Sequence, residues 1–357
     1  MIKKQSSKQL LLAGEDRKVF YSRGNLYVSD ATREREVLLS PIPAGILKRI
    51  CSAIPLMERI LRLRPRCAAW VNENLFLIAR KGRIYRGDLI ERTVVPEHNF
   101  QEGMGAPLNM CRISGLKGFR DGILYGTYRT EHGRVSIWHR DNHGIWTEAY
   151  CFPEGRVLHI HNIIADYQNQ RLLILTGDSD QESGIWEAKN DFSEMNLLLG
   201  GTQQYRACVA FPENGHIVFA TDTPLEENYL YDYDEKEQVV HTVCALPGPV
   251  IFGAVVENSG GKTYVFSTSV EPDSQITGLR YMVTHKLGQG VKTRESHVFA
   301  GNRSRGFREV HKFKKDIWPM GLCQFGNTCF PNGKLKRLSV CPQGVKKYSG
   351  KTMEVTY

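Results

Sequence analysis

One repeat of this chain opens with His159-Ile160-His161-Asn162 and closes with Thr176-Gly177-Asp178-Ser179-Asp180-Gln181-Glu182. A second repeat opens with Tyr205-Arg206 and closes with Thr221-Asp222-Thr223-Pro224-Leu225-Glu226. In both, polar residues precede an apolar segment, a turn follows, and a second apolar segment ends in acids. Two antiparallel strands joined by a turn place the start of the first beside the end of the second. We therefore expect the acids of each repeat to lie beside the His or Arg that opens it. Hairpins arranged radially would gather these groups on one face.

The same hairpin pattern recurs along most of the chain. Short runs rich in β-branched and aromatic residues alternate with turns that contain Gly, Asn or Asp, which is typical of an all-β fold. Aligned units of roughly 45 residues match the four-stranded blades of a β-propeller. The units cover about 111–155, 156–200, 201–245 and 246–300, with further candidates at 15–42, 66–100 and from 305 onward.

We therefore predict a single β-propeller domain over residues 1–357, with six or seven four-stranded blades and seven favoured. An open ring of blades would leave an unpaired strand edge. Strands from both termini are thus expected to share a blade, and the basic C-terminal segment 303–357 is expected to close the ring.

The segment 44–62 has a different periodicity. Its apolar residues recur at helical spacing, and Pro55 divides it into two short helices. The interpretation that we favour is a helical insertion that covers part of the propeller. Because its polar positions are mostly basic, a membrane-surface or partner-binding helix is the alternative.

Composition limits the class of protein. The 357 residues are 41% hydrophobic and 24% charged, as in ordinary globular proteins, and no apolar run approaches the roughly 20 residues of a membrane-spanning helix. The apolar patch near the N-terminus is too short for a signal-peptide core, so we expect a cytoplasmic protein. The net charge of +9 indicates first a solubilising surface and second an attraction for an acidic partner such as a polyanionic glycan. No nucleic-acid recognition motif is found, so nucleic acid is not an expected partner.

The nine cysteines are scattered and form no CxxC pair. We expect reduced thiols that behave as small apolar side chains. A disulfide or zinc site near Cys323, Cys329 and Cys341 is the alternative.

Several motifs resemble those of the sialidase-like BNR/Asp-box propellers, and in particular those of bacterial members that occur with polysaccharide genes. The matching stretches are His159–Asn162, Thr176–Trp186, Gln203–Arg206, Ala220–Tyr229, Gly248–Val250, Phe266–Pro272 and Gln324–Asn327. They extend over roughly 110–335, more than half of the chain. The resemblance implies a propeller that binds or cleaves carbohydrate.

Two positions depart from the pattern of that family. Asp141-Asn142-His143-Gly144-Ile145-Trp146 keeps the Asp, Gly and Trp of an Asp-box but is shorter and lacks its Ser. In the family this turn is structural and joins the third and fourth strands. Thr127 occupies the position where the resemblance implies an acid. If that acid is catalytic in relatives, its absence would weaken or abolish the activity of this protein. The arginine triad and the Tyr/Glu nucleophile pair of true sialidases are not demonstrable, so sialidase activity is not expected.

Our candidates for catalysis are His159, His161, Asp178, Asp222 and Tyr125. His159 and His161 alternate with Ile160, so on a strand both imidazoles point to one side. Two roles are equally favoured for them: general acid or base chemistry with substrate contact, and hydrogen bonding to neighbouring loops. Binding of a divalent cation together with Asp178, Asp180 or Glu182 is a third alternative. We assign no metal ligand and expect no cofactor.

Our candidates for substrate binding are Arg206, Glu182, Glu226, Tyr229 and Glu271. Arg206 would pair with Asp178 or Asp222, or hold a substrate carboxylate through two parallel hydrogen bonds. The acids suit sugar hydroxyls, acid–base chemistry or turn capping. Tyr125 and Tyr229 would stack on sugar faces, with core packing as the favoured alternative for each tyrosine.

The leading hypothesis is a carbohydrate-active propeller that binds an oligo- or polysaccharide in the pocket where the candidates converge. It would cleave this glycan by hydrolysis or β-elimination, as a glycoside hydrolase or a polysaccharide lyase. The alternative is a non-catalytic propeller that binds glycan or protein in surface-polysaccharide biosynthesis. The absent export signal and Thr127 favour this alternative.

Overall fold

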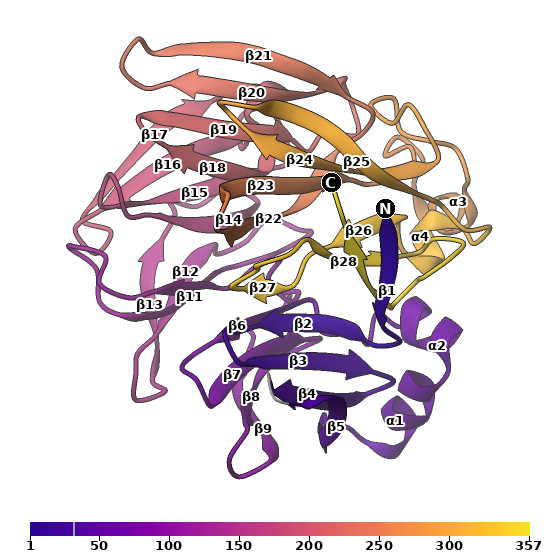
Figure 1. The fold of residues 1–357 in the computed structure, drawn as a ribbon. Helices are drawn as coiled ribbons and strands as arrows, with labels where there is room; N and C mark the ends of the chain where they lie inside the picture. The colour runs from indigo at the N-terminus through magenta and orange to yellow at the C-terminus, as the bar shows by residue number, and fades with distance from the viewer. Residues whose placement is uncertain (31–32) are drawn as a thin grey trace. The chain divides into compact units, whose positions relative to one another are not determined.

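The computed structural model describes residues 1–30 and 33–357 (Figure 1). Within this part of the chain the strands form seven β-sheets, and six of them have four strands. The seventh has a fifth, two-residue strand. The fold is a seven-bladed β-propeller, which confirms the predicted fold class and the favoured blade number.

The contacts within the chain divide it into two compact units. Unit 1 comprises Met1–Arg64, Asp222–Tyr229 and Cys244–Tyr357, and unit 2 comprises Pro65–Thr221 and Leu230–Val243. Each unit is described by itself below, and the single domain over 1–357 stays a prediction.

Unit 2 holds most of four sheets, each of four strands that follow one another in sequence. Their strands are β6 (Cys67–Trp70), β7 (Leu75–Arg80), β8 (Arg83–Asp88) and β9 (Thr93–Asn99); β10 (Cys111–Ile113), β11 (Gly122–Gly126), β12 (Ser136–Arg140) and β13 (Trp146–Cys151); β14 (His159–Asp166), β15 (Arg171–Gly177), β16 (Gly184–Lys189) and β17 (Glu194–Gly200); β18 (Ala207–Glu213), β19 (His216–Thr221), β20 (Asn228–Asp234) and β21 (Val239–Leu246). A short 3-10 helix, η1 (Gln203–Tyr205), precedes β18.

Unit 1 holds the other three sheets. In their order of pairing the strands are β27 (Asn332–Gly333), β2 (Gln9–Ala13), β3 (Arg17–Ser22), β4 (Asn25–Asp30) and β5 (Arg33–Pro41); β1 (Ile2–Ser6), β29 (Thr352–Val355), β28 (Ser339–Gln343) and β26 (Asn327–Cys329); β22 (Val250–Asn258), β23 (Gly261–Thr268), β24 (Glu295–Asn302) and β25 (Gly306–Lys314). The first strand of the chain pairs antiparallel with the last, Ile2 opposite Val355. The predicted pairing of strands from both termini is therefore confirmed.

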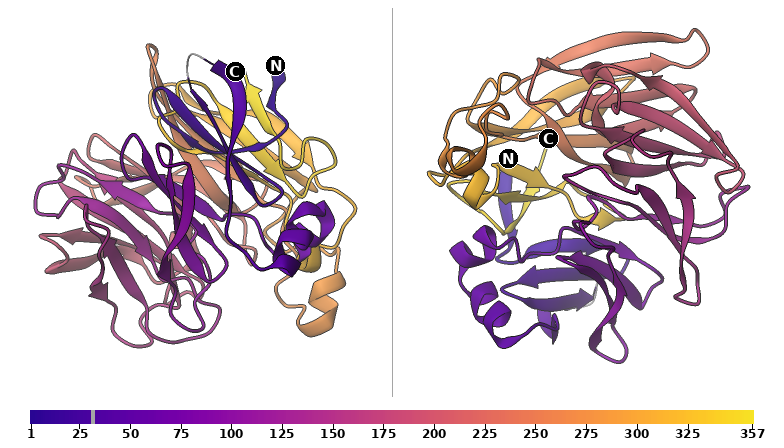
Figure 2. Two further views of the ribbon diagram at one scale, coloured as in Figure 1. Left: turned by 90° about the horizontal axis from the view of Figure 1, so that it is seen from below. Right: turned by 180° about the vertical axis from the view of Figure 1, so that it is seen from behind.

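The predicted helical segment 44–62 forms two helices, α1 (Ile46–Ala53) and α2 (Pro55–Ile60), which lie beside the strands of unit 1 (Figures 1 and 2). In α2, Glu58 is buried and accepts hydrogen bonds from Tyr21 Oη and Arg64 Nε, at 2.6 and 2.7 Å. In α1 only Ser52 is buried. Its apolar side chains, as at Ile46, stay exposed, so α2 covers the sheets as favoured but α1 does not.

Two further short helices, α3 (Gly278–Val283) and α4 (Met320–Cys323), belong to unit 1. In the described part of the chain, no helix has the length and apolar character that crossing a membrane requires. All nine cysteines are free thiols. Cys329 and Cys341 lie opposite each other on β26 and β28, and burial raises the pKa of both thiols.

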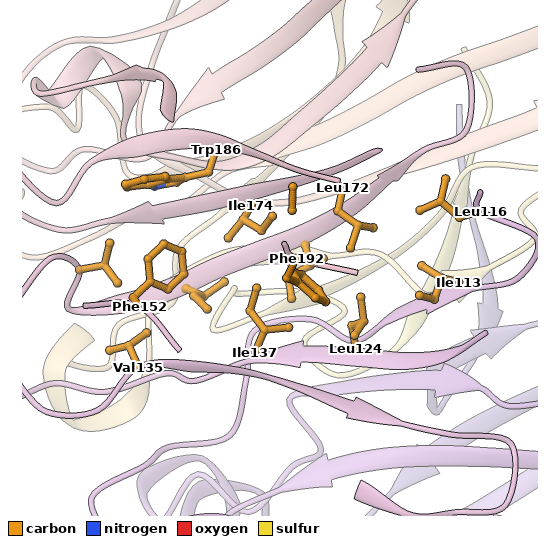
Figure 3. Close-up of a cluster of buried hydrophobic side chains, with 14 residues drawn as sticks. Ile113, Leu116, Leu124, Val135, Ile137, Phe152, Leu172, Ile174, Trp186 and Phe192 are labelled. Carbon is orange, nitrogen blue, oxygen red and sulfur yellow. The ribbon is translucent and has the colours of Figure 1, made fainter. Parts of the chain in front are cut away.

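Apolar side chains between neighbouring sheets hold unit 2 together. One such core lies between the sheets β10–β13 and β14–β17 (Figure 3). It contains Leu124, Ile137, Leu172 and Ile174, each at most 1% exposed. Full burial of such a side chain contributes roughly 1.5–3 kcal/mol. Strand β15 is buried at every position, because a strand inside a blade has sheets packed on both of its faces.

Four sheets share an irregularity that the sequence pattern does not predict. Their first hairpin contains a β-bulge, where one residue of the first strand has no partner on the second. The extra residues are Leu11 in β2, His161 in β14, Cys208 in β18 and Ile251 in β22. A bulge bends the strand and changes the direction of its side chains.

A buried ion cluster joins two blades of unit 2 at the end of the sheets where β15 begins. The Arg171 guanidinium donates to Asp166, Glu187 and Glu235 at 2.8, 2.8 and 2.6 Å. Arg171 and Asp166 are 3% and 2% exposed. One cation therefore compensates three carboxylates, two from its own sheet and one that follows β20.

Replacement of Arg171 by Met is expected to lower the free energy of unfolding by about 3–5 kcal/mol, because it leaves buried carboxylates without their cation. Lys189→Met is the matched control. Lys189 contacts the same Glu187 at 2.9 Å but is 39% exposed, so its loss should cost no more than about 1 kcal/mol. Urea unfolding of both variants checks this. Equal losses of unfolding free energy in the two variants would contradict the stabilising role of the Arg171 cluster.

Candidate functional site

The predicted meeting of polar residues occurs at one end of the sheet β14–β17, in unit 2. His159 begins β14 and lies opposite Gly177, the last residue of β15. Asp178 follows directly. The hairpin therefore returns this acid to the histidines that open the repeat, as the sequence predicts.

The bulge in β14 decides how the two imidazoles meet. Ile160 lies opposite Thr176 and Asn162 opposite Leu175, so His161 is the extra residue. The bulge changes the direction of the His161 side chain relative to regular alternation. In the structure the Nε2 atoms of the two rings are only 2.8 Å apart.

Main-chain carbonyls fix the tautomer of both rings. His159 Nδ1 lies 2.7 Å from the carbonyl oxygen of Arg129, and His161 Nδ1 lies 2.9 Å from that of Ala207. A carbonyl only accepts, so each Nδ1 carries the proton. In the neutral rings both Nε2 atoms are then acceptors, and they face each other.

Asp178 and Arg206 complete the group. Asp178 Oδ1 lies 3.5 Å from His159 Nε2, 3.4 Å from His161 Nε2 and 2.7 Å from Arg206 Nη2. The histidines are 2% and 3% exposed, whereas the Asp178 side chain is 38% exposed. The carboxylate thus forms the solvent-facing side of an otherwise buried site.

Burial and charge act on the two titrating groups in different ways. Burial lowers the pKa of His161, and the nearby Asp178 opposes this only partly. Burial alone would raise the pKa of Asp178, but the Arg206 guanidinium beside it holds this pKa well below its usual range. The site therefore combines an imidazole that stays neutral with a carboxylate that stays ionised.

Tyr128 extends the group toward the preceding sheet. Its ring stacks on His159, with centroids 4.3 Å apart, and the Arg66 guanidinium carbon lies 4.1 Å from the Tyr128 ring centroid. Burial raises the pKa of the Tyr128 phenol. We name His159, His161, Asp178, Arg206 and Tyr128 the histidine cluster.

Thr127 and Glu182 lie in the same unit but serve the local backbone. Thr127 is fully buried, and its Oγ1 donates to the carbonyl of Ser136 at 3.0 Å. Glu182, a predicted substrate-binding residue, accepts from the main-chain N and Oγ of Ser179 at 3.1 and 2.6 Å. It also contacts His132 at 3.4 Å. Glu182 thus caps the turn that carries Asp178.

Tyr125 lies apart from the histidine cluster, in the core packing that we favour for each tyrosine. It is 1% exposed and packs in the core between the sheets β6–β9 and β10–β13. Its hydroxyl meets His98 Nε2 at 2.7 Å, and its ring contacts Trp138 and Trp146. No surface of this ring is open for stacking on a sugar, because a strand-end position in one blade faces the next blade.

The remaining predicted residues belong to unit 1. Asp222 follows β19 and is buried, whereas Glu226 is exposed. Tyr229 donates its hydroxyl to Glu227 at 2.7 Å. Glu271 is 8% exposed and is hydrogen-bonded to Ser269 Oγ. The roles proposed for these four residues stay predictions.

The sequence predicts the side chains of the cluster but not the groups that orient them. The carbonyls of Arg129 and Ala207 carry no residue-specific signal. Arg66 precedes the cluster by more than 60 positions, in a segment without any motif. The sequence indicates Tyr128 as a donor of a phenolic proton, with core packing favoured, but it does not predict the stacking on His159.

Comparisons with known proteins support the fold. No family model matches the chain, and no curated protein matches it significantly. A solved oligogalacturonate lyase from Vibrio parahaemolyticus is 9% identical with a TM-score of 0.55, over 99% of this chain and 90% of that chain. A chain of the mitotic checkpoint complex is 8% identical with a TM-score of 0.54, over 98% and 87% of the two chains. At such identities the likeness concerns the fold alone.

The Tyr125 environment predicts a pH dependence of stability. Burial lowers the pKa of His98, and the charge of Glu97 only partly opposes this. The unfolded chain, with a histidine pKa near 6.5, binds more protons than the folded chain as the pH falls below that value, so acidification favours unfolding. His98→Gln keeps a polar partner for Tyr125 but does not titrate. Urea unfolding between pH 7.5 and about 5 should show a shallower loss in this variant, and identical slopes would contradict the assignment.

Proposed function

We propose that unit 2 binds an acidic oligo- or polysaccharide at the histidine cluster and cleaves it by β-elimination. The observation that carries the proposal is the convergence of two imidazole Nε2 atoms and one carboxylate oxygen within 3.5 Å of one another, beside Arg206. Fixed tautomers and fixed geometry are the properties of groups that handle protons or substrate oxygens.

Elimination from a uronate needs two things that this group offers. A cation beside the substrate carboxylate stabilises the charge that develops when the neighbouring carbon loses its proton. Arg206, within the cluster, and Arg66, beside Tyr128, supply such cations. A base, which is an imidazole Nε2 or the Tyr128 phenolate, takes that proton. The electron pair then forms a carbon–carbon double bond, the glycosidic carbon–oxygen bond at the β-carbon breaks, and the leaving oxygen takes up a proton from the protonated base or from water.

Hydrolysis fits the described residues of unit 2 less well. It uses two carboxyl groups, one of which is protonated and donates to the leaving oxygen. The ion pair with Arg206 keeps Asp178 ionised. Glu182, the other acid of this turn, is bound to Ser179 and His132. Elimination requires no protonated acid of this kind.

Fold-level likeness gives this proposal limited support. One protein of the same fold is an oligogalacturonate lyase, but propellers host many functions. We also propose kinship with the sialidase-like BNR/Asp-box propellers. In its favour, the turn 141–145 joins β12 to β13, and Asp141 Oδ1 accepts the main-chain N–H groups of His143 and Ile145 at 2.9 and 2.8 Å.

The second candidate is a non-catalytic propeller that binds glycan or protein. Thr127 favours it, since the position expected to carry an acid holds a buried hydroxyl that is committed to Ser136. In that case the cluster recognises an anionic sugar without cleaving it.

Incubation of the purified protein with a panel of acidic and neutral bacterial polysaccharides separates these functions. We expect the absorbance of unsaturated uronates to rise with the acidic polymers. His161→Ala should reduce the rate by about 100-fold or more, as for loss of an acid–base group. His143→Ala, in the exposed turn 141–145, is the matched control and should retain the rate.

Three other outcomes are informative. Reducing ends without absorbance would replace elimination by hydrolysis. Saturable binding without product would favour the non-catalytic protein. Neither binding nor product across the panel would contradict both functions.

A further inference from the structure

The two histidines of the cluster present an electrostatic problem. Each Nδ1 donates its proton to a carbonyl, so each Nε2 of a neutral ring presents a lone pair. These lone pairs face each other across 2.8 Å, and Asp178 Oδ1 adds further negative charge at 3.4–3.5 Å. Three acceptors that converge in a buried place repel one another unless a positive species lies among them.

We propose that His159, His161 and Asp178 bind one divalent transition-metal ion. The three atoms, separated by 2.8, 3.4 and 3.5 Å, lie on a circle of radius about 1.9 Å. This radius is slightly less than a metal–nitrogen or metal–oxygen bond of roughly 2.0–2.2 Å. A single ion about 0.9 Å out of their plane thus reaches all three at about 2.1 Å without movement of the protein.

The surroundings of the three ligands are those of a built metal site. Metal-bound histidines usually donate their other ring N–H to a carbonyl or carboxylate, which fixes the ring and its tautomer. Here both do so, to Arg129 and to Ala207. Arg206 donates to the Asp178 carboxylate and orients it in the same way.

The ligand set indicates the class of ion. Two imidazoles and one carboxylate suit Zn²⁺, Fe²⁺ or Mn²⁺ better than Mg²⁺ or Ca²⁺, which prefer oxygen ligands alone. The angles at an ion 2.1 Å from each atom are about 84° between the nitrogens and about 110° to the oxygen, so the three ligands occupy one side. Solvent reaches the group from the side of Asp178, whose side chain is 38% exposed, so water or substrate would complete the coordination.

The ion would change the charge that a substrate meets, a step that rests on the proposed function. Asp178 and Arg206 cancel each other, so a divalent ion brings the group to about +2. Such a site binds a uronate carboxylate and acidifies the adjacent carbon. The histidine nitrogens are then ligands, so the Tyr128 oxygen would take the proton in its phenolate form, which the Arg66 charge favours and burial opposes.

Metal binding is measured without any glycan. Chelator-treated, dialysed protein is titrated with Zn²⁺ and, separately, with Mn²⁺ by calorimetry. We expect one equivalent to bind, and His159→Ala and Asp178→Asn to weaken binding by at least the roughly 10–100-fold that loss of an orienting partner costs. His143→Ala and Glu154→Gln are the matched controls, since both residues are exposed, and they should bind like the wild type.

Nitrogen NMR of the two rings tests the competing explanation, in which one proton is shared between the Nε2 atoms. Binding of the ion should shift both Nε2 signals, with saturation at one equivalent. No binding by the folded wild type, together with a protonated Nε2 that persists in excess Zn²⁺, would overturn the proposal. So would equal loss of affinity in the control variants. Asp178→Asn nearly preserves size, so it remains informative if His159→Ala does not fold.

The metal site and the proposed function can fail separately. Stoichiometric Zn²⁺ binding without glycan cleavage leaves the metal site standing and removes the lyase. Cleavage that survives complete removal of metal by a chelator keeps the lyase and removes the catalytic use of the ion. For the recognition step, glucuronate should bind to the Zn²⁺-loaded protein and glucose should not.

Discussion

The geometry of the histidine cluster depends on two hydrogen bonds from imidazole Nδ1 atoms to main-chain carbonyls. His159 donates to Arg129, in the loop between β11 and β12, and His161 donates to Ala207, at the start of β18. Each histidine of one blade is thereby tied to a different neighbouring blade. Both rings must then direct Nε2 at the same point, whatever that point holds. Around this point lie the carboxylate of Asp178, the guanidinium of Arg206 and the ring of Tyr128.

The charges around this point nearly cancel. In the absence of an ion, one carboxylate and one guanidinium compensate each other beside two imidazoles. A species that combines positive charge with an affinity for nitrogen satisfies all three acceptors. Purely structural histidines are compatible with this contact if one proton is shared between the two Nε2 atoms.

Much of the fold was predictable from the sequence because it depends on local patterns. Period-two runs, turn residues and a repeat of about 45 residues define strands and blades whatever their neighbours are. Pro55 marked the break between α1 and α2 for the same reason. The site was predictable in part. A hairpin returns Asp178 to His159 by geometry alone, and an arginine at the start of the next blade was an evident partner.

The features of the site that the sequence does not predict depend on packing between blades. The bulge at His161, the carbonyls that accept from the histidines and the approach of Arg66 are properties of packing, which no single stretch of sequence encodes. Tyr125 illustrates the same limit. An aromatic residue at a strand end is equally compatible with a pocket and with a core, and only the adjacent sheet shows that it packs against His98.

The bulges at Leu11, His161, Cys208 and Ile251 have an evolutionary consequence. A residue outside the ladder of paired strands can be exchanged without altering the register of its sheet, so selection on its chemistry is separated from selection on folding. Three of these positions hold an apolar or thiol side chain and one holds an imidazole. Duplication of a blade therefore also copies its bulge. The side chain at the bulge can then change in one copy, and bring a new reactivity, while the other copies keep the fold.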